Sequence, residues 1–68
     1  MNLNPKYLIK VLEQNGFVFL RSKGSHQLFH NKRTGKTVVV PVHGGKDMKK
    51  GTFLSILKYA DIDKKDLF

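Results

Sequence analysis

The chain has 68 residues, and we expect residues 1–68 to form a single domain with a thin core. It contains no cysteine, which excludes disulfides and thiolate metal sites, and its apolar runs are far shorter than the roughly 20 residues of a membrane span. Thirteen Lys and Arg residues against five Asp and Glu give a formal net charge of +8, so we expect a polyanionic partner, most commonly a nucleic acid.

The first residues, MNLNPKYLIK, lack the basic and apolar regions of a signal peptide, and we expect a cytoplasmic protein. Asn4-Pro5 is a typical helix start, because Asn can cap the first turn and Pro suits the first helical position. Gly16 is suited to the position after a helix, so we predict a helix over about 5–15. Its apolar residues have the i, i+3, i+4 spacing of a buried stripe: Leu8, Val11 and Leu12.

Three segments rich in branched and aromatic residues then predict strands. They are separated by a turn at Lys23-Gly24 and by the polar loop NKRTGK, which is typical of a hairpin. Pro41 cannot donate to a sheet ladder, so we expect the third strand to lie at an edge of the sheet. The predicted strands cover residues 17–22, 25–30 and 37–42.

A last helix is predicted to begin within residues 48–52 and to end near Ala60. We expect Asp63 to cap a short final turn that packs Leu67 and Phe68 against the core. The fold class is therefore α+β with the order α-β-β-β-α, a three-stranded antiparallel sheet with both helices on one face. Double-stranded RNA-binding domains have this order, which favours RNA as the partner by analogy of fold.

Three histidines, His26, His30 and His43, are the candidates for chemistry. His26 and His30 are four residues apart, which on a strand separates them by about 13 Å, too far to share a metal ion. We therefore expect no metal site, and nothing in the sequence indicates a cofactor.

Acid–base chemistry on RNA is the reaction that these residue types support. Cleavage needs a base for the 2′-hydroxyl, an acid for the leaving 5′-oxygen and positive charge at the phosphate. His26 follows Gly24-Ser25, where glycine permits a close backbone approach and the serine hydroxyl can bind a phosphate, and Arg21 and Lys23 are adjacent. From spacing alone, however, a half-exposed strand histidine bonded to a neighbour is the preferred interpretation.

The other two histidines have less specific surroundings. We expect His30, at the end of the hairpin, to be a solvated surface residue. His43 precedes Gly44-Gly45-Lys46 and can either face the same site as His26 or anchor its loop. The glycines do not complete a phosphate-binding loop, since no Ser or Thr follows the lysine.

The segments GFVFLRSKGSHQLF and TVVVPVHGGKDMKKGTFLSILKYADI closely resemble the HicA family of bacterial and archaeal toxins. The most specific parts are G-S-H, V-P-V-H and K-G-T-F-L-S-I-L-K, and the resemblance extends from the first helix to Ile62. It implies a double-stranded RNA-binding-like fold, mRNA interferase activity with His26 as the catalytic residue, and a HicB antitoxin that covers the site.

The sequence departs from the common pattern of the resembled family at three positions. Lys50 stands where many members have Pro, and Asp61 stands where many end the last helix with Gly. Gln27 replaces a second histidine, so we do not expect that position to supply a required proton. We predict that RNA is bound by Arg21, Lys23, Gly24, Ser25, Lys32, Arg33, Lys36, His43 and Lys46.

Two alternatives to a ribonuclease toxin remain at this stage. A non-catalytic RNA-binding module of the same fold explains the charge equally well and leaves His26 as a contact residue. A protein-interaction subunit would instead use its basic face for an acidic protein. Binding to double-stranded DNA is the least favoured, because no helix-turn-helix is predicted and neither helix is basic along an exposed face.

Overall fold

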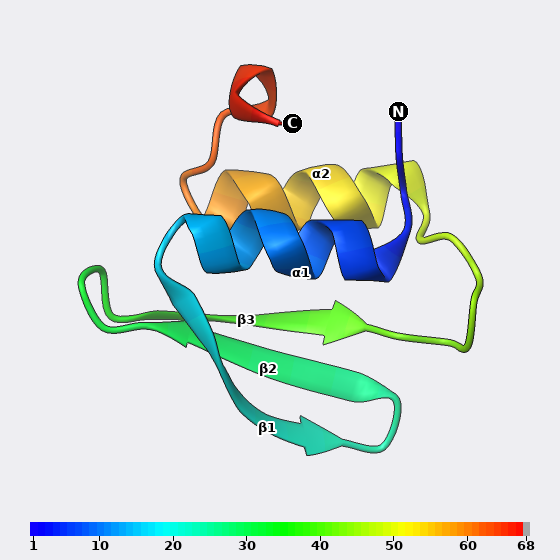
Figure 1. The fold of residues 1–68 in the computed structure, drawn as a ribbon, viewed down its shortest axis with the longest axis horizontal. Helices are drawn as coiled ribbons and strands as arrows, with labels where there is room; N and C mark the ends of the chain where they lie inside the picture. The colour runs from blue at the N-terminus through cyan, green and yellow to red at the C-terminus, as the bar shows by residue number, and fades with distance from the viewer. Residues whose placement is uncertain (68) are drawn as a thin grey trace.

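The computed structural model describes residues 1–67, so the predicted packing of Phe68 lies outside the described residues. The elements follow the order α-β-β-β-α and end in a short 3-10 helix, which confirms the predicted fold class. Both helices lie on the same side of an antiparallel sheet (Figure 1). The bounds are α1 Pro5–Gln14, β1 Phe17–Lys23, β2 His26–Asn31, β3 Lys36–Pro41, α2 Lys50–Tyr59 and η1 Lys64–Asp66.

Helix α1 starts as the sequence predicts and ends one residue earlier. The Asn4 side chain accepts a hydrogen bond of 2.8 Å from the backbone N–H of Lys6, and Pro5 occupies the first turn. Gly16 follows the helix with a φ of +91°, a backbone conformation that glycine adopts without a steric penalty. Phe17 can then enter the core directly as the first residue of β1.

The sheet has the order β1-β2-β3, so β3 is an edge strand as predicted, and Pro41 is its last residue. Lys23 pairs with His26, which makes Gly24 and Ser25 the turn. The observed turn therefore lies one residue after the turn predicted at Lys23-Gly24. Lys23, Asn31 and Lys36, which the sequence assigned to turns, are all paired strand residues. Because Asn31 pairs with Lys36, β3 begins one residue earlier than predicted.

Helix α2 begins at Lys50, within the predicted range, although Lys49 before it supplies no side-chain cap. Its end is a Schellman motif: the Ile62 N–H donates to the Leu57 carbonyl at 2.9 Å and the Asp61 N–H to the Lys58 carbonyl at 3.1 Å. Asp61 takes the left-handed position of the motif, with a φ of +59°. Among residues 1–67 no helix is long and apolar enough to cross a membrane.

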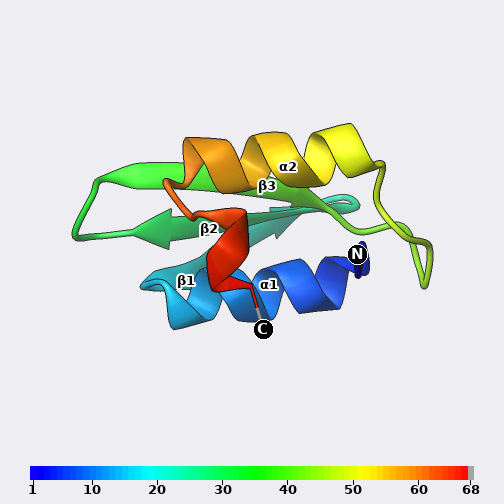
Figure 2. The same cartoon turned by 90° about the horizontal axis from the view of Figure 1, so that it is seen from above.

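The predicted short final turn is present as η1. The Asp63 side chain accepts from the Lys65 N–H at 3.0 Å and caps it, and Leu67 packs against the core as a half-buried residue. Seen from above, α2 runs along β3 while α1 lies on the β1 side (Figure 2).

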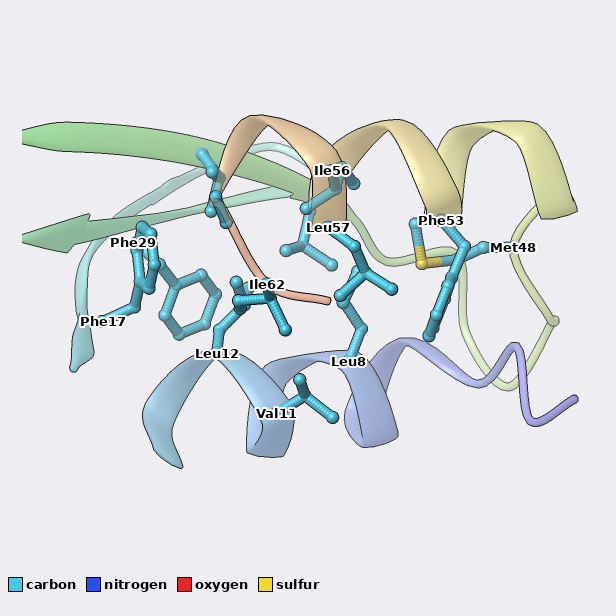
Figure 3. Packing of buried hydrophobic residues seen from close by; sticks show 13 residues of the cluster. Leu8, Val11, Leu12, Phe17, Phe29, Met48, Phe53, Ile56, Leu57 and Ile62 are labelled. Carbon is cyan, nitrogen blue, oxygen red and sulfur yellow. The ribbon is translucent and has the colours of Figure 1, made fainter. Parts of the chain in front are cut away.

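One apolar core fills the space between the helices and the sheet (Figure 3). The three buried Phe rings come from β1, β2 and α2, so the core joins elements from both ends of the chain. The core residues are Leu8, Val11, Leu12, Phe17, Phe29, Val38, Val40, Met48, Phe53, Ile56, Leu57, Ala60 and Ile62.

Asn31 is a buried polar residue beside this core, 2% exposed. Its side-chain amide donates to the carbonyl of Asn15 at 3.0 Å, and its side-chain oxygen accepts from the N–H of Arg33 at 2.9 Å. The side chain therefore joins the end of α1 to the turn between β2 and β3, and its polar atoms are satisfied.

The face of the sheet away from the helices, which we name the open face, carries three rows of cross-strand neighbours. Alternate residues of a strand point to opposite faces of the sheet. The buried Phe29 and Val38 face the helices, so their neighbours along β2 and β3 belong to the open face. The far row is Val18, His30 and Thr37; the middle row is Arg21, Leu28 and Val39; the end row is Lys23, His26 and Pro41.

Candidate active site

His26 is positioned by a two-residue turn at the start of β2. Gly24 has a φ of +58° and Ser25 does not have a positive φ, the pattern of a type II′ hairpin turn. Such a turn favours glycine at its first position, because a residue with a side chain is strained at that positive φ. The backbone conformation alone therefore accounts for the glycine at position 24. The turn places Lys23 directly opposite His26 at the end of the open face, where both are exposed.

His43 joins His26 at this end of the sheet. The Val42 N–H donates to the Ser25 carbonyl at 2.7 Å, which continues the pairing of β2 and β3 beyond Pro41. The imidazole rings of His26 and His43 then lie with centroids 6.5 Å apart at an interplanar angle of 76°. Of the two possibilities left by the sequence, the structure therefore has His43 facing His26.

Three predicted RNA-binding cations lie near this pair of histidines. Arg21 and Lys23 stand on β1, in the middle and end rows of the open face. Lys46 comes from the loop after β3, where its N–H donates to the carbonyl of His43 at 3.1 Å. The sheet register and the loop after β3 therefore place these cationic residues on two sides of the histidine pair.

A hollow of about 510 Å³ opens beside His43, between the exit of β3 and the start of α2. Three of its polar side chains, Asp47, Lys49 and Thr52, were not assigned to the site by the sequence interpretation. The only sequence signal for Lys49 is its place in the basic pair Lys49-Lys50, a few residues after His43. The hollow is lined by Pro41, His43, Lys46, Asp47, Met48, Lys49 and Thr52.

Lys32 and Arg33, also predicted to bind RNA, lie at the opposite end of the sheet. They stand in the turn between β2 and β3, about 20 Å along the strand from His26 at roughly 3.3 Å per residue. The structure therefore does not bring them to the histidine pair.

Lys36 is held by the end of α2. Its ammonium donates to the carboxylate of Asp61 at 2.6 Å and to the backbone carbonyl of Tyr59 at 3.0 Å, and it lies 5.4 Å from the centre of the Tyr59 ring. These contacts join β3 to the C-terminus of α2. Lys36 is thus engaged within the fold and lies away from the histidine pair.

His30 differs from the solvated residue that the sequence suggested. It is half-buried in the far row, and its Nδ1 shares a 2.8 Å hydrogen bond with the Thr37 hydroxyl across β2 and β3. His26 and His30 both lie on β2 as predicted, four residues apart. Within residues 1–67, no three His, Cys, Asp or Glu side chains are grouped so that they could hold a metal ion.

Comparison with known proteins identifies the family of this chain. Residues 5–62 of the 68 match the family model described as HicA toxin of bacterial toxin-antitoxin. A comparison with curated proteins gives no match. The matched range extends from the first residue of α1 to the Schellman motif of α2, and includes both histidines of the pair. Because the model covers most of the chain, the protein belongs to the HicA toxin family.

Proposed function

We propose that this chain is an mRNA interferase, an endoribonuclease in which His26 is an acid–base residue and which a HicB-type antitoxin neutralises. The observation that carries this proposal is the pairing of the His26 and His43 rings, 6.5 Å apart, among the cations of an exposed sheet end. The chain belongs to a toxin family, and cleavage of cytoplasmic transcripts by the histidine pair would account for toxicity by stopping growth.

The chemistry requires two proton transfers at one phosphodiester group. A base removes the 2′-hydroxyl proton, the 2′-oxygen attacks phosphorus, the bond from phosphorus to the 5′-oxygen breaks, and an acid protonates that oxygen. The products are a 2′,3′-cyclic phosphate and a 5′-hydroxyl. A catalytic group must come within about 3 Å of its proton, and two rings 6.5 Å apart can both reach atoms of a single group.

The surrounding residues supply the remaining requirements. Arg21, Lys23 and Lys46 stabilise the negative charge that develops on the phosphate oxygens. The Gly24-Ser25 turn leaves open space at Gly24, where an added Cβ would meet no atom within 4 Å, so an RNA backbone can approach closely. Histidine serves as acid and base near neutral pH, so this reaction needs no metal ion or cofactor.

The test is cleavage of a long single-stranded RNA by the purified protein and by His26→Ala. We expect His26→Ala to lower the cleavage rate by about 100-fold or more, the usual contribution of a positioned acid–base group. His30→Ala is the matched control, because His30 lies on the same strand and the same face without facing His43. It should cleave at a rate close to that of the wild type.

The outcomes separate this proposal from a non-catalytic RNA-binding module. Cleavage by His26→Ala at the wild-type rate contradicts the role of His26. If the wild type binds RNA but leaves it intact, the chain is a binding module. If it neither binds nor cleaves RNA at low salt, the basic surface serves a protein partner.

A further inference from the structure

The hollow beside His43 adjoins the histidine pair, and the proposed chemistry does not use it. Its volume of about 510 Å³ lies within the range of about 300–1,000 Å³ that is typical of sites for small molecules. It opens between β3 and α2, where the connecting segment extends past the end of the sheet (Figure 1). Because His43 and Lys46 line it, the hollow shares a wall with the candidate active site.

The backbone around the hollow is tied to the rest of the fold. The Lys46 N–H donates to the His43 carbonyl at 3.1 Å, which closes a turn at the exit of β3. The Met48 N–H donates to the Leu3 carbonyl at 2.8 Å, and the Met48 side chain is buried in the core. The segment that carries the lining side chains is therefore held at both of these points.

The lining of the hollow offers donors that have no partner within the fold. Lys46 and Lys49 line it together with one carboxylate, that of Asp47, and all three residues are exposed. Within residues 1–67 neither lysine forms an ion pair, with Asp47 or with any other carboxylate. Thr52 is half-buried in the first turn of α2, and in the same part of the chain its hydroxyl has no hydrogen-bond partner. Ammonium groups and hydroxyls are the side-chain donors with which proteins hold phosphate oxygens.

The hollow is placed where the next phosphate of a bound RNA would lie. His43 stands between the hollow and His26, because it lines the hollow and its ring lies 6.5 Å from the His26 ring. A strand with one phosphodiester group at the histidine pair carries its next phosphate one nucleotide further along. On the α2 side of the pair, the basic surface that this phosphate meets is the hollow.

We propose that the hollow is a second phosphate subsite, in which Lys49 and Thr52 hold the RNA phosphate adjacent to the one at the histidine pair. This inference rests on the proposed function, which puts the cleaved phosphodiester group at the pair. Lys46 lies between the two subsites and contributes to both. Contacts to phosphates carry no sequence information, so the subsite accepts any base and holds the strand in register with the histidines.

The experiment combines a protein variant with a chemical change in the RNA. Lys49→Gln removes one charge from the hollow, and Lys50→Gln is the matched control, because Lys50 is also exposed but does not line the hollow. The ligand is a short single-stranded RNA in which the bond cleaved by the wild type is mapped first. Versions of it carry a single neutral methylphosphonate linkage at each other phosphate in turn. Dissociation constants are measured in a His26→Ala background, and thermal unfolding verifies that each variant is folded.

We expect Lys49→Gln to weaken binding of the unmodified RNA about tenfold, and Lys50→Gln to weaken it by no more than about twofold. A methylphosphonate at a phosphate next to the cleaved bond should weaken binding by about as much as Lys49→Gln does. In Lys49→Gln the same methylphosphonate should have little further effect, because both changes remove one contact. Thr52→Val keeps the branched shape without the hydroxyl and should weaken binding about threefold.

Three results would overturn the proposal. The first is an equal loss of affinity in Lys49→Gln and Lys50→Gln, and the second is additivity of Lys49→Gln with the methylphosphonate at every position. The third is coupling of Lys49 only to a phosphate that does not adjoin the cleaved bond. Failure of the proposed function is distinguishable, because the wild type would then leave the RNA intact while Lys49 remained coupled to one phosphate in the binding measurement.

Discussion

At the scale of single residues, the account depends on His26 and His43 sharing one phosphodiester group. Both rings are exposed, and their contact is fixed by the backbone hydrogen bond from Val42 to Ser25. With one imidazole as base and the other as acid, activity requires one neutral and one protonated ring. Such a pair gives a bell-shaped dependence of the cleavage rate on pH.

Removing His43 should therefore change the shape of the pH profile as well as the rate. We expect His43→Ala to cleave about 100-fold more slowly and to lose one limb of the bell, because one titrating group is gone. The measurement is the cleavage rate from pH 5 to pH 9 for the wild type and the variant. A profile that keeps both limbs, only scaled down, would mean that His43 merely anchors its loop.

The candidate site was predictable in part from the sequence. The G-S-H step made His26 a candidate, but spacing alone favoured a strand histidine bonded to a neighbour. Only the resemblance to the HicA family pointed to a catalytic role, which stays a prediction. The contact with His43 was not predictable from spacing, since it depends on the register that pairs His26 with Pro41. Likewise, nothing local shows that Lys36 pairs with Asp61, 25 residues away.

At the scale of elements, Asn31 connects the end of α1 to the turn between β2 and β3. Without its side chain, the carbonyl of Asn15 and the N–H of Arg33 lose these hydrogen-bond partners at a partly buried site. An unsatisfied buried polar group costs about 1–3 kcal/mol.

We expect Asn31→Ala to lower the free energy of unfolding by about 2 kcal/mol, within that range. Urea unfolding is the measurement, with Gln27→Ala as a control, since Gln27 belongs to the same face of β2 but is not buried. Cleavage should survive at low temperature, because Asn31 is at the opposite end of β2 from His26. A change of less than about 0.5 kcal/mol would refute this role.

The elements themselves were predicted well because their signals are local. Asn4-Pro5 marked the start of α1, and Asp63 capped η1 as expected. The first hairpin turn is displaced by one residue from its predicted place, and the second is shorter than predicted by one residue at each end. The pairing across the strands decides where a turn starts, and the sequence does not show that pairing. Asp61, a departure from the glycine common in the family, takes the left-handed position and is stabilised there by Lys36.

At the scale of the whole molecule, the net charge of +8 is unevenly distributed around the fold. Lys46 and Lys49 line the hollow beside His43, whereas Lys64 and Lys65 belong to η1, on the side of the helices away from the sheet. If RNA binds along the end of the molecule that carries the histidine pair, counterions are released from the RNA by Lys46 and Lys49 and not by Lys64 and Lys65.

Salt dependence of RNA binding should therefore distinguish the two lysine pairs. In a His26→Ala background, Lys46→Ala/Lys49→Ala should reduce the slope of log K against log salt by about 1.4, or 0.7 for each phosphate contact to a single strand. Lys64→Ala/Lys65→Ala changes the net charge equally and should leave the slope unaltered. Equal slopes for both double variants would show that RNA responds only to overall charge.

The central claim is that His26 cleaves RNA by acid–base chemistry, and the chemical ends of the products test it most directly. The measurement is analysis of both new ends after incubation of labelled single-stranded RNA with EDTA present. The account predicts 2′,3′-cyclic phosphate and 5′-hydroxyl ends with the wild type, and formation of these ends at least about 100-fold more slowly with His26→Ala. Ends bearing a 5′-phosphate, or equal cleavage by His26→Ala, would contradict it.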